Sequence, residues 1–262
     1  MLPSALLPQA TKARQAPLDW QPPKFAVYAA LWQKFLMRGF GFAVGIVCSL
    51  LSSAAFSEDV RLGDSSVKVS PPKGFCELDK TNKADVALFD RASDYVKVGG
   101  FSLIALYVDC RELGEHRKSS AFILTKVVIA RFVKRADRPP SQFISEACDK
   151  LREGLSDEQK ARISKYVTEF SKGNSSVQNT LSLGVLDEVK GAVCYSGQLI
   201  KAKIANTGEV AAVYLTAGTF VDDQPIGIFQ WSNYVDATSI AAALANLKII
   251  YSDFAAANGK SP

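Results

Sequence analysis

Residues 183–200, LGVLDEVKGAVCYSGQLI, and residues 210–234, VAAVYLTAGTFVDDQPIGIFQWSNY, decide the fold of this protein. Both stretches are rich in β-branched and aromatic residues, which favour strands. A short polar turn interrupts each of them, Lys190-Gly191 in the first and residues 222–225 (DDQP) in the second. Connections this short join antiparallel neighbours. The pattern therefore predicts a β meander with strands over Leu183–Val189, Ala192–Ile200, Val210–Val221 and Ile226–Tyr234.

The chain before the meander predicts further strands and helices. Ser102–Val108 (SLIALYV) is a nearly continuous apolar run, as expected of a central strand, and residues 121–133 form a second β-rich stretch. Capping residues or a first-turn proline predict three helices. These helices are expected over residues 82–99, 140–154 and 156–172.

A last helix is predicted from about Thr238, because apolar residues recur there at helical spacing. The stripe consists of Ile240, Leu244, Leu247, Tyr251 and Phe254. We therefore expect an α+β domain over residues 58–262. It has a mostly antiparallel sheet of about six to seven strands, helices packed on that sheet, and a C-terminal amphipathic helix.

The excess of basic over acidic residues lies almost entirely before residue 58. The formal net charge is +5, but five basic residues and one acidic residue lie before that position, so residues 58–262 are nearly neutral. A nucleic-acid-binding domain needs a concentrated cationic surface. The composition, 48% hydrophobic and 22% charged, is that of a folded globular chain. We expect a folded domain that does not bind nucleic acid.

Residues 39–57 carry no charge and follow Arg38. An apolar run (FGFAVGIVCSLL) is followed there by small residues up to Ser57. A cation, an apolar segment and small residues form the pattern of a secretory signal. Cleavage is expected after Ser57 or Ala55, which would deliver the domain to the periplasm or the medium.

The same stretch has an alternative interpretation as a membrane anchor. Its length approaches the roughly 20 residues that span a bilayer as a helix. The protein would then contact the inner membrane through residues 39–57, with its domain outside the cytoplasm. A start at Met37 gives a signal of standard shape over residues 37–57. Residues 1–36 are then expected to be a non-structural extension.

Removal of the leader takes Cys48 with it and leaves Cys76, Cys110, Cys148 and Cys194. An even number of cysteines in an exported domain predicts disulfides. A helix that runs away from Cys76 and a strand that returns to Cys110 would bring these two together. Cys148 on a helix and Cys194 in a strand then either form a second bridge or remain two buried thiols.

Three segments resemble a family of uncharacterised exported proteobacterial proteins. They are Pro71–Leu78 (PPKGFCEL), Ala105–Leu113 (ALYVDCREL) and the ending Tyr251 to Asn258. The resemblance implies an exported domain and supplies no catalytic residues. The order of strands and helices is also similar to the Mog1/PsbP-like α/β/α arrangement, a comparison that rests on topology alone.

The common catalytic and cofactor-binding motifs are absent from the sequence. His116 is the only histidine, and no GxSxG, GxxxxGK[ST] or GxGxxG accompanies it. No spacing typical of a metal site occurs, and no CxxC pair is present. We therefore predict no catalytic residue, no metal and no cofactor.

Polar residues cluster after the strand that ends near Val108. Asp109, Arg111, Glu112 and His116 follow it, in a stretch expected to be an exposed loop. Two interpretations stay open for this cluster, a pocket for a small ligand or a salt-bridged loop.

A second polar cluster is basic. It consists of Lys126, Arg131, Lys134, Arg135 and Arg138. We expect it to be the solvated side and exit of a strand, with binding of lipid headgroups or a polyanion as the alternative.

These observations predict a non-enzymatic, exported domain that binds or supports an envelope protein or a small ligand. One alternative is the same domain on a single-pass membrane anchor. Another is a hydrolase that relies on carboxylates only, which motifs would not reveal.

Overall fold

Seven strands form one antiparallel sheet, in the order β3-β4-β5-β9-β8-β7-β6. The computed structural model describes residues 58–62, 65–134, 136–154, 156–157, 161, 175–205 and 207–260. The extension over 1–36, the signal or anchor over 37–57, Arg135 and most of the helix expected over 156–172 lie outside these residues. The strands are β3 (Phe75–Glu77), β4 (Phe101–Asp109), β5 (Lys126–Phe132), β6 (Ser175–Val189), β7 (Val193–Ile204), β8 (Gly208–Val221) and β9 (Gln224–Asn233).

The meander predicted from the turns is confirmed by β6 to β9. Asp222 and Asp223 form the β8–β9 turn with φ of 44° and 63°. Two consecutive positive φ angles are characteristic of the two-residue type I′ hairpin turn, which matches the twist of the strands. β6 begins at residue 175 rather than 183, and the register of its pairing with β7 shifts at three places.

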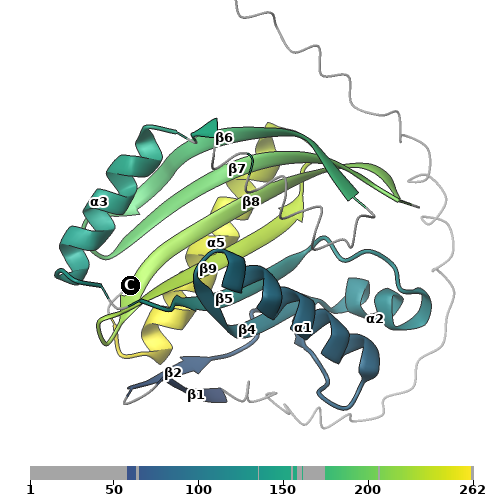
Figure 1. The fold of residues 1–262 in the computed structure, drawn as a ribbon, viewed down its shortest axis with the longest axis horizontal. Helices are drawn as coiled ribbons and strands as arrows, with labels where there is room; N and C mark the ends of the chain where they lie inside the picture. Colours follow the sequence, from purple (N-terminus) through teal and green to yellow (C-terminus); the bar gives the residue numbers. More distant parts are fainter. Residues whose placement is uncertain are drawn as a thin grey trace, which may run out of the picture. The chain divides into compact units, whose positions relative to one another are not determined.

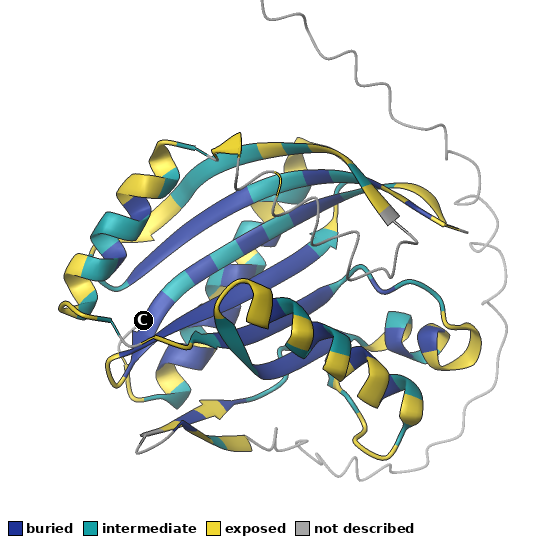
Figure 2. Ribbon diagram, viewed as in Figure 1, coloured by how far each residue is buried: buried dark blue, intermediate teal, exposed yellow. Residues whose placement is uncertain are grey.

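Helices cover both faces of the sheet (Figure 1). One face carries α1 (Lys83–Val98) and α2 (Cys110–Ser119) over the β4 side, and α3 (Pro140–Arg152) over the β6 and β7 side. The other face carries α5 (Ala237–Ala257) and the hairpin of β1 (Glu58–Leu62) and β2 (Ser65–Val69). The central strands are accordingly the most buried part of the fold (Figure 2). The predicted α+β class is confirmed.

Helix α5 begins with a capping box between Asp236 and Ser239. The expected stripe packs on the sheet, with Leu247, Tyr251 and Phe254 buried. The opposite side is also largely apolar, because it consists mainly of alanines and the 60% exposed Ile249. Among the described residues, α5 alone is long and apolar enough to cross a membrane. Of its apolar segment 33% is buried, and the buried residues pack on the sheet.

Candidate functional site

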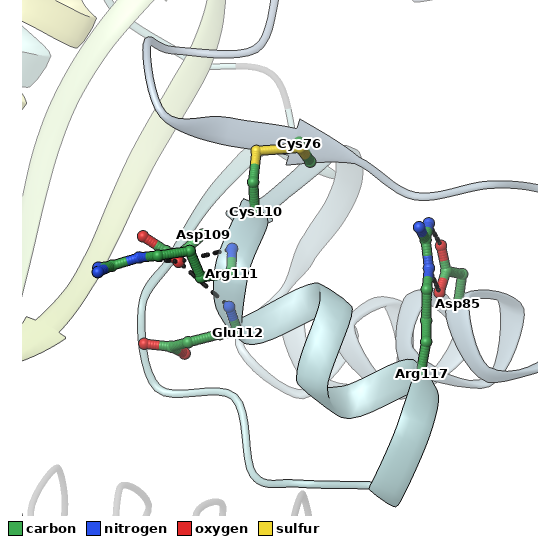
Figure 3. The surroundings of a disulfide bond; sticks show 7 residues. All are labelled: Cys76, Asp85, Asp109, Cys110, Arg111, Glu112 and Arg117. Carbon is green, nitrogen blue, oxygen red and sulfur yellow. Dashed lines mark hydrogen bonds and ion pairs between the residues drawn. A yellow bond between two sulfur atoms is a disulfide. The ribbon is translucent and has the colours of Figure 1, made fainter.

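The stretch after β4 is a helix rather than the expected exposed loop. Asp109 is the N-cap of α2, and its carboxylate accepts hydrogen bonds from the backbone N–H groups of Arg111 (3.0 Å) and Glu112 (3.2 Å), drawn in Figure 3. A capping carboxylate satisfies N–H groups that the helix itself leaves without partners. The Arg111 side chain is 91% exposed, and its Nε lies 3.6 Å from the Asp109 carboxylate.

Glu112 has a structural role in the first turn of the same helix. Its Oε2 accepts hydrogen bonds from the backbone N–H groups of Leu124 (2.7 Å) and Thr125 (2.9 Å). These two residues lie just before β5, and the carbonyl of Thr125 accepts a hydrogen bond from the N–H of Asp109 at the end of β4 (3.0 Å). The carboxylate therefore ties the two residues that precede β5 to α2.

The expectation that His116 is exposed is wrong, because α2 turns this side chain inward. His116 as a residue is 9% exposed, and its Nδ1 lies 2.6 Å from the carbonyl oxygen of Ala121. A carbonyl only accepts, so this contact requires the proton on Nδ1. The chain leaves α2 at Ser120 with φ of 56°, which directs Ala121 back toward the ring. His116 thus fixes the end of the helix.

A buried ion pair that the sequence did not predict lies beside this cluster. Asp85 of α1 is completely buried, and its two carboxylate oxygens accept hydrogen bonds from Nε (3.0 Å) and Nη2 of Arg117, as Figure 3 shows. The backbone N–H of Asp79 donates to the same carboxylate at 2.8 Å. Hydrogen bonding to Arg117 lowers the pKa of Asp85, while burial opposes this shift. The position of Asp85, three residues after the N-cap Asn82, was a local signal for a first-turn carboxylate but not for its partner.

Two disulfides join elements distant in the sequence. Cys76 of β3 is bonded to Cys110 at the start of α2 (S–S 2.03 Å, Cα–Cα 5.0 Å; Figure 3), which is the predicted pairing. Cys148 of α3 is bonded to Cys194 of β7 (Cα–Cα 5.8 Å) in a buried cluster, so this bridge rather than two free thiols is present. Two disulfides in one domain are typical of proteins in an oxidising, extracytoplasmic compartment.

The predicted site residues therefore form a structural cluster. Asp109 and Glu112 use carboxylate oxygens to hold backbone N–H groups, and His116 holds a carbonyl. Cys76–Cys110 fixes the first turn of the helix to β3. The segment is a helix and not the salt-bridged loop of one interpretation, and a small-ligand pocket at this cluster stays a prediction.

A pocket lies on the opposite face of the sheet, between α5 and the chain from β2 to β3. Its volume is about 190 Å³. The apolar floor contains Ile129 of β5 with Ile250 and Phe254 of α5. The exposed residues Lys68, Lys73 and Asp253 complete its lining, together with residues 70–72. An apolar floor with a few charged groups is the usual construction of a small-ligand site.

Asn258 holds one wall of this pocket in place. Its Oδ1 accepts from the backbone N–H of Lys68 at 2.9 Å, and its Nδ2 donates to the carbonyl of Lys68 at 2.9 Å. The same Nδ2 donates to the carbonyl of Phe254 at 2.8 Å. One amide therefore joins the end of α5 to β2, and both elements line the pocket.

The basic cluster differs from its prediction at Lys126. This residue is 8% exposed, and its Nζ lies 5.0 Å from the centroid of the Trp231 ring and 5.9 Å from that of Phe122. Burial lowers the pKa of Lys126 to about 8. β5 is a central strand, so Lys126 at its start packs against aromatic rings instead of facing solvent. In the described part of the chain, no group of three or more His, Cys, Asp or Glu side chains is arranged to hold a metal ion.

Comparison with known proteins gives little further information. No protein-family model and no curated protein sequence matches the chain. The resemblance to exported proteobacterial proteins therefore stays a prediction. The structure of the Ran-binding protein Mog1p from Saccharomyces cerevisiae is similar over 80% of this chain and 86% of that chain, with 12% identity and a TM-score of 0.28. We draw no functional conclusion from a likeness at this level.

Proposed function

We propose that residues 58–262 form an extracytoplasmic binding domain without enzymatic activity. The observation that carries this proposal is the pair of disulfides, Cys76–Cys110 and Cys148–Cys194, which use all four cysteines after residue 57. Cytosolic reductants keep most protein thiols reduced, so a domain with two structural disulfides fits an oxidising compartment. The signal-like segment over residues 39–57 supports the same location.

The state of the polar groups supports binding over catalysis. General acid–base catalysis needs a titratable group that can reach a substrate proton. Glu112, His116 and Asp85 instead make hydrogen bonds that hold helices and loops. The pocket beside α5 combines an apolar floor with exposed charges, an arrangement that retains a ligand without requiring a reactive group.

The test follows the protein produced from its own upstream region. Cells are fractionated, and the N-terminus and the intact mass are measured with and without reduction. We expect a periplasmic or secreted product that begins at Phe56 or Glu58 and gains four hydrogen atoms on reduction. A product that retains residues 37–57 and sediments with membranes would favour the single-pass anchor. A soluble cytoplasmic product in which Cys76, Cys110, Cys148 and Cys194 are reduced would overturn the proposal.

A further inference from the structure

The dimensions of the pocket beside α5 limit the ligand. An apolar cavity of about 150 Å³ binds benzene. The pocket here is somewhat larger, about 190 Å³, and therefore accommodates an apolar body of roughly six to nine non-hydrogen atoms. Such a volume is below the range of drug-sized sites, so a nucleotide or a sugar chain would not be enclosed.

The walls around the floor are held before any ligand arrives. Pro71 and Pro72 lie in the lining, and their rings restrict the backbone of this segment. The carbonyl of Pro72 accepts from the N–H of Phe75 at 3.0 Å, and the carbonyl of Gly74 accepts from the N–H of Cys110 at 3.2 Å. On the other side, Asn258 ties Lys68 to α5. A site that is already ordered loses little conformational entropy when it binds.

Charges at the pocket favour an anion. Lys68, Lys73 and Asp253 line it and are exposed, and in the described part of the chain they form no ion pair with other side chains. The two lysines therefore outnumber the one carboxylate around an apolar floor.

We propose that this pocket binds a small monocarboxylate with an apolar aryl or branched aliphatic body. The body lies on Ile129, Ile250 and Phe254, and the carboxylate faces Lys68 and Lys73. Asp253 disfavours a second negative charge, which makes a monoanion a better ligand than a dianion. This inference rests on the proposed binding function and specifies its ligand.

The test uses the protein in the form that cells accumulate, purified with its disulfides intact. The probe is 3-phenylpropionate, and 3-phenylpropanol, with the same body and no charge, is the matched control ligand. Affinities are measured by titration calorimetry at low salt. We expect 3-phenylpropionate to bind at least about fivefold more tightly than the alcohol, and this difference should shrink as salt is added.

Three charge variants and one control variant locate the site. Lys68→Gln and Lys73→Gln should each weaken binding of 3-phenylpropionate by about threefold to fivefold, and Asp253→Asn should strengthen it by about twofold to threefold. Lys83→Gln, an exposed lysine on α1 at the other face of the sheet, should leave the affinity unchanged. All four side chains are exposed, so folding should persist, and thermal unfolding midpoints check this.

Specific results would overturn the inference. Equal affinity for the acid and the alcohol would remove the role of the carboxylate. Unchanged binding in both lysine variants would place the ligand elsewhere. An exported, oxidised protein with no measurable affinity for the probe would refute this ligand class and leave the proposed compartment intact. Reduced cysteines in a cytoplasmic product would instead refute the proposed function, whatever the probe does.

Discussion

Asp85→Asn should destabilise the fold more than any other single charge removal on α1. The native carboxylate accepts hydrogen bonds from Nε and Nη2 of Arg117 and from the N–H of Asp79. Asparagine keeps the shape of this side chain but removes its negative charge. Removing one partner of a buried ion pair typically costs about 3–5 kcal/mol. The Arg117 side chain is 36% exposed, so water can hydrate the charge that remains, and we expect a loss of about 2–3 kcal/mol.

Urea unfolding followed by tryptophan fluorescence at pH 7 measures this loss. The matched control is Asp94→Asn, the same replacement on the same helix. Asp94 is 78% exposed and pairs with Lys97 at 3.2 Å, so the control should cost less than about 0.5 kcal/mol. An equal effect of the two replacements would refute the view that the Asp85 pair locks α1 to α2.

The dependence on pH gives a second check of the same pair. Hydrogen bonding to Arg117 lowers the pKa of Asp85 below its ordinary value of 3.8. A carboxyl with a lowered folded-state pKa contributes its full stability above the unfolded-state pKa, and this contribution is lost as the pH falls through the folded-state value. The difference between the native protein and Asp85→Asn should therefore be constant from pH 5 to 8 and shrink below about pH 4.

Three further perturbations test other parts of the fold. The double change Cys76→Ser and Cys110→Ser opens a loop with a sequence separation of 34 and should lower the free energy of unfolding by roughly 3–4 kcal/mol in urea titrations; an unchanged midpoint would contradict a structural disulfide. Gly197→Ala places a Cβ 2.6 Å from a methyl group of a buried leucine of β8 and should lower the free energy of unfolding by about 1–3 kcal/mol. The control Gly218→Ala has open space around its Cβ and should lower it by less in the same assay. Burial lowers the pKa of Lys126 from 10.5 to about 8. Between these pH values the unfolded chain binds more protons than the folded protein, so the free energy of unfolding should rise with pH there. Lys126→Met removes the buried charge, so it should abolish this rise and increase the thermal midpoint at pH 7.

The meander was predictable because its signals are local. The Asp222-Asp223 turn and the β-branched runs beside it determine strand pairing between neighbours in the sequence. The order of the strands in the whole sheet was not predictable, because β5 pairs with β9 across almost 100 residues of sequence. That pairing depends on which apolar faces pack together in three dimensions, and local patterns do not encode it.

Helix α2 was missed for a different reason. Its sequence, CRELGEHRKS, is mostly polar and contains a glycine, so it lacks the apolar periodicity that reveals a helix. Asp109 followed by Glu112 matches the start signal of a helix, and this was the one local indication. The inward position of His116 then follows from the helix, not from its own chemistry. The pocket beside α5 could not be predicted, because Lys68, Ile129 and Phe254 meet only after the sheet and α5 have formed.

The three segments on which the predicted family resemblance rests contribute to the pocket beside α5 or to the Cys76–Cys110 disulfide. Pro71–Leu78 supplies one wall of the pocket and then Cys76, while Ala105–Leu113 supplies the end of β4, Cys110 and the cap of α2. The ending Tyr251 to Asn258 supplies Phe254 of the floor and the amide that clamps β2. The pocket wall is thus tied to the α5 end by Asn258 and to α2 by the Cys76–Cys110 disulfide. An oxidising compartment, which preserves that disulfide, also keeps the wall of the proposed carboxylate site in place.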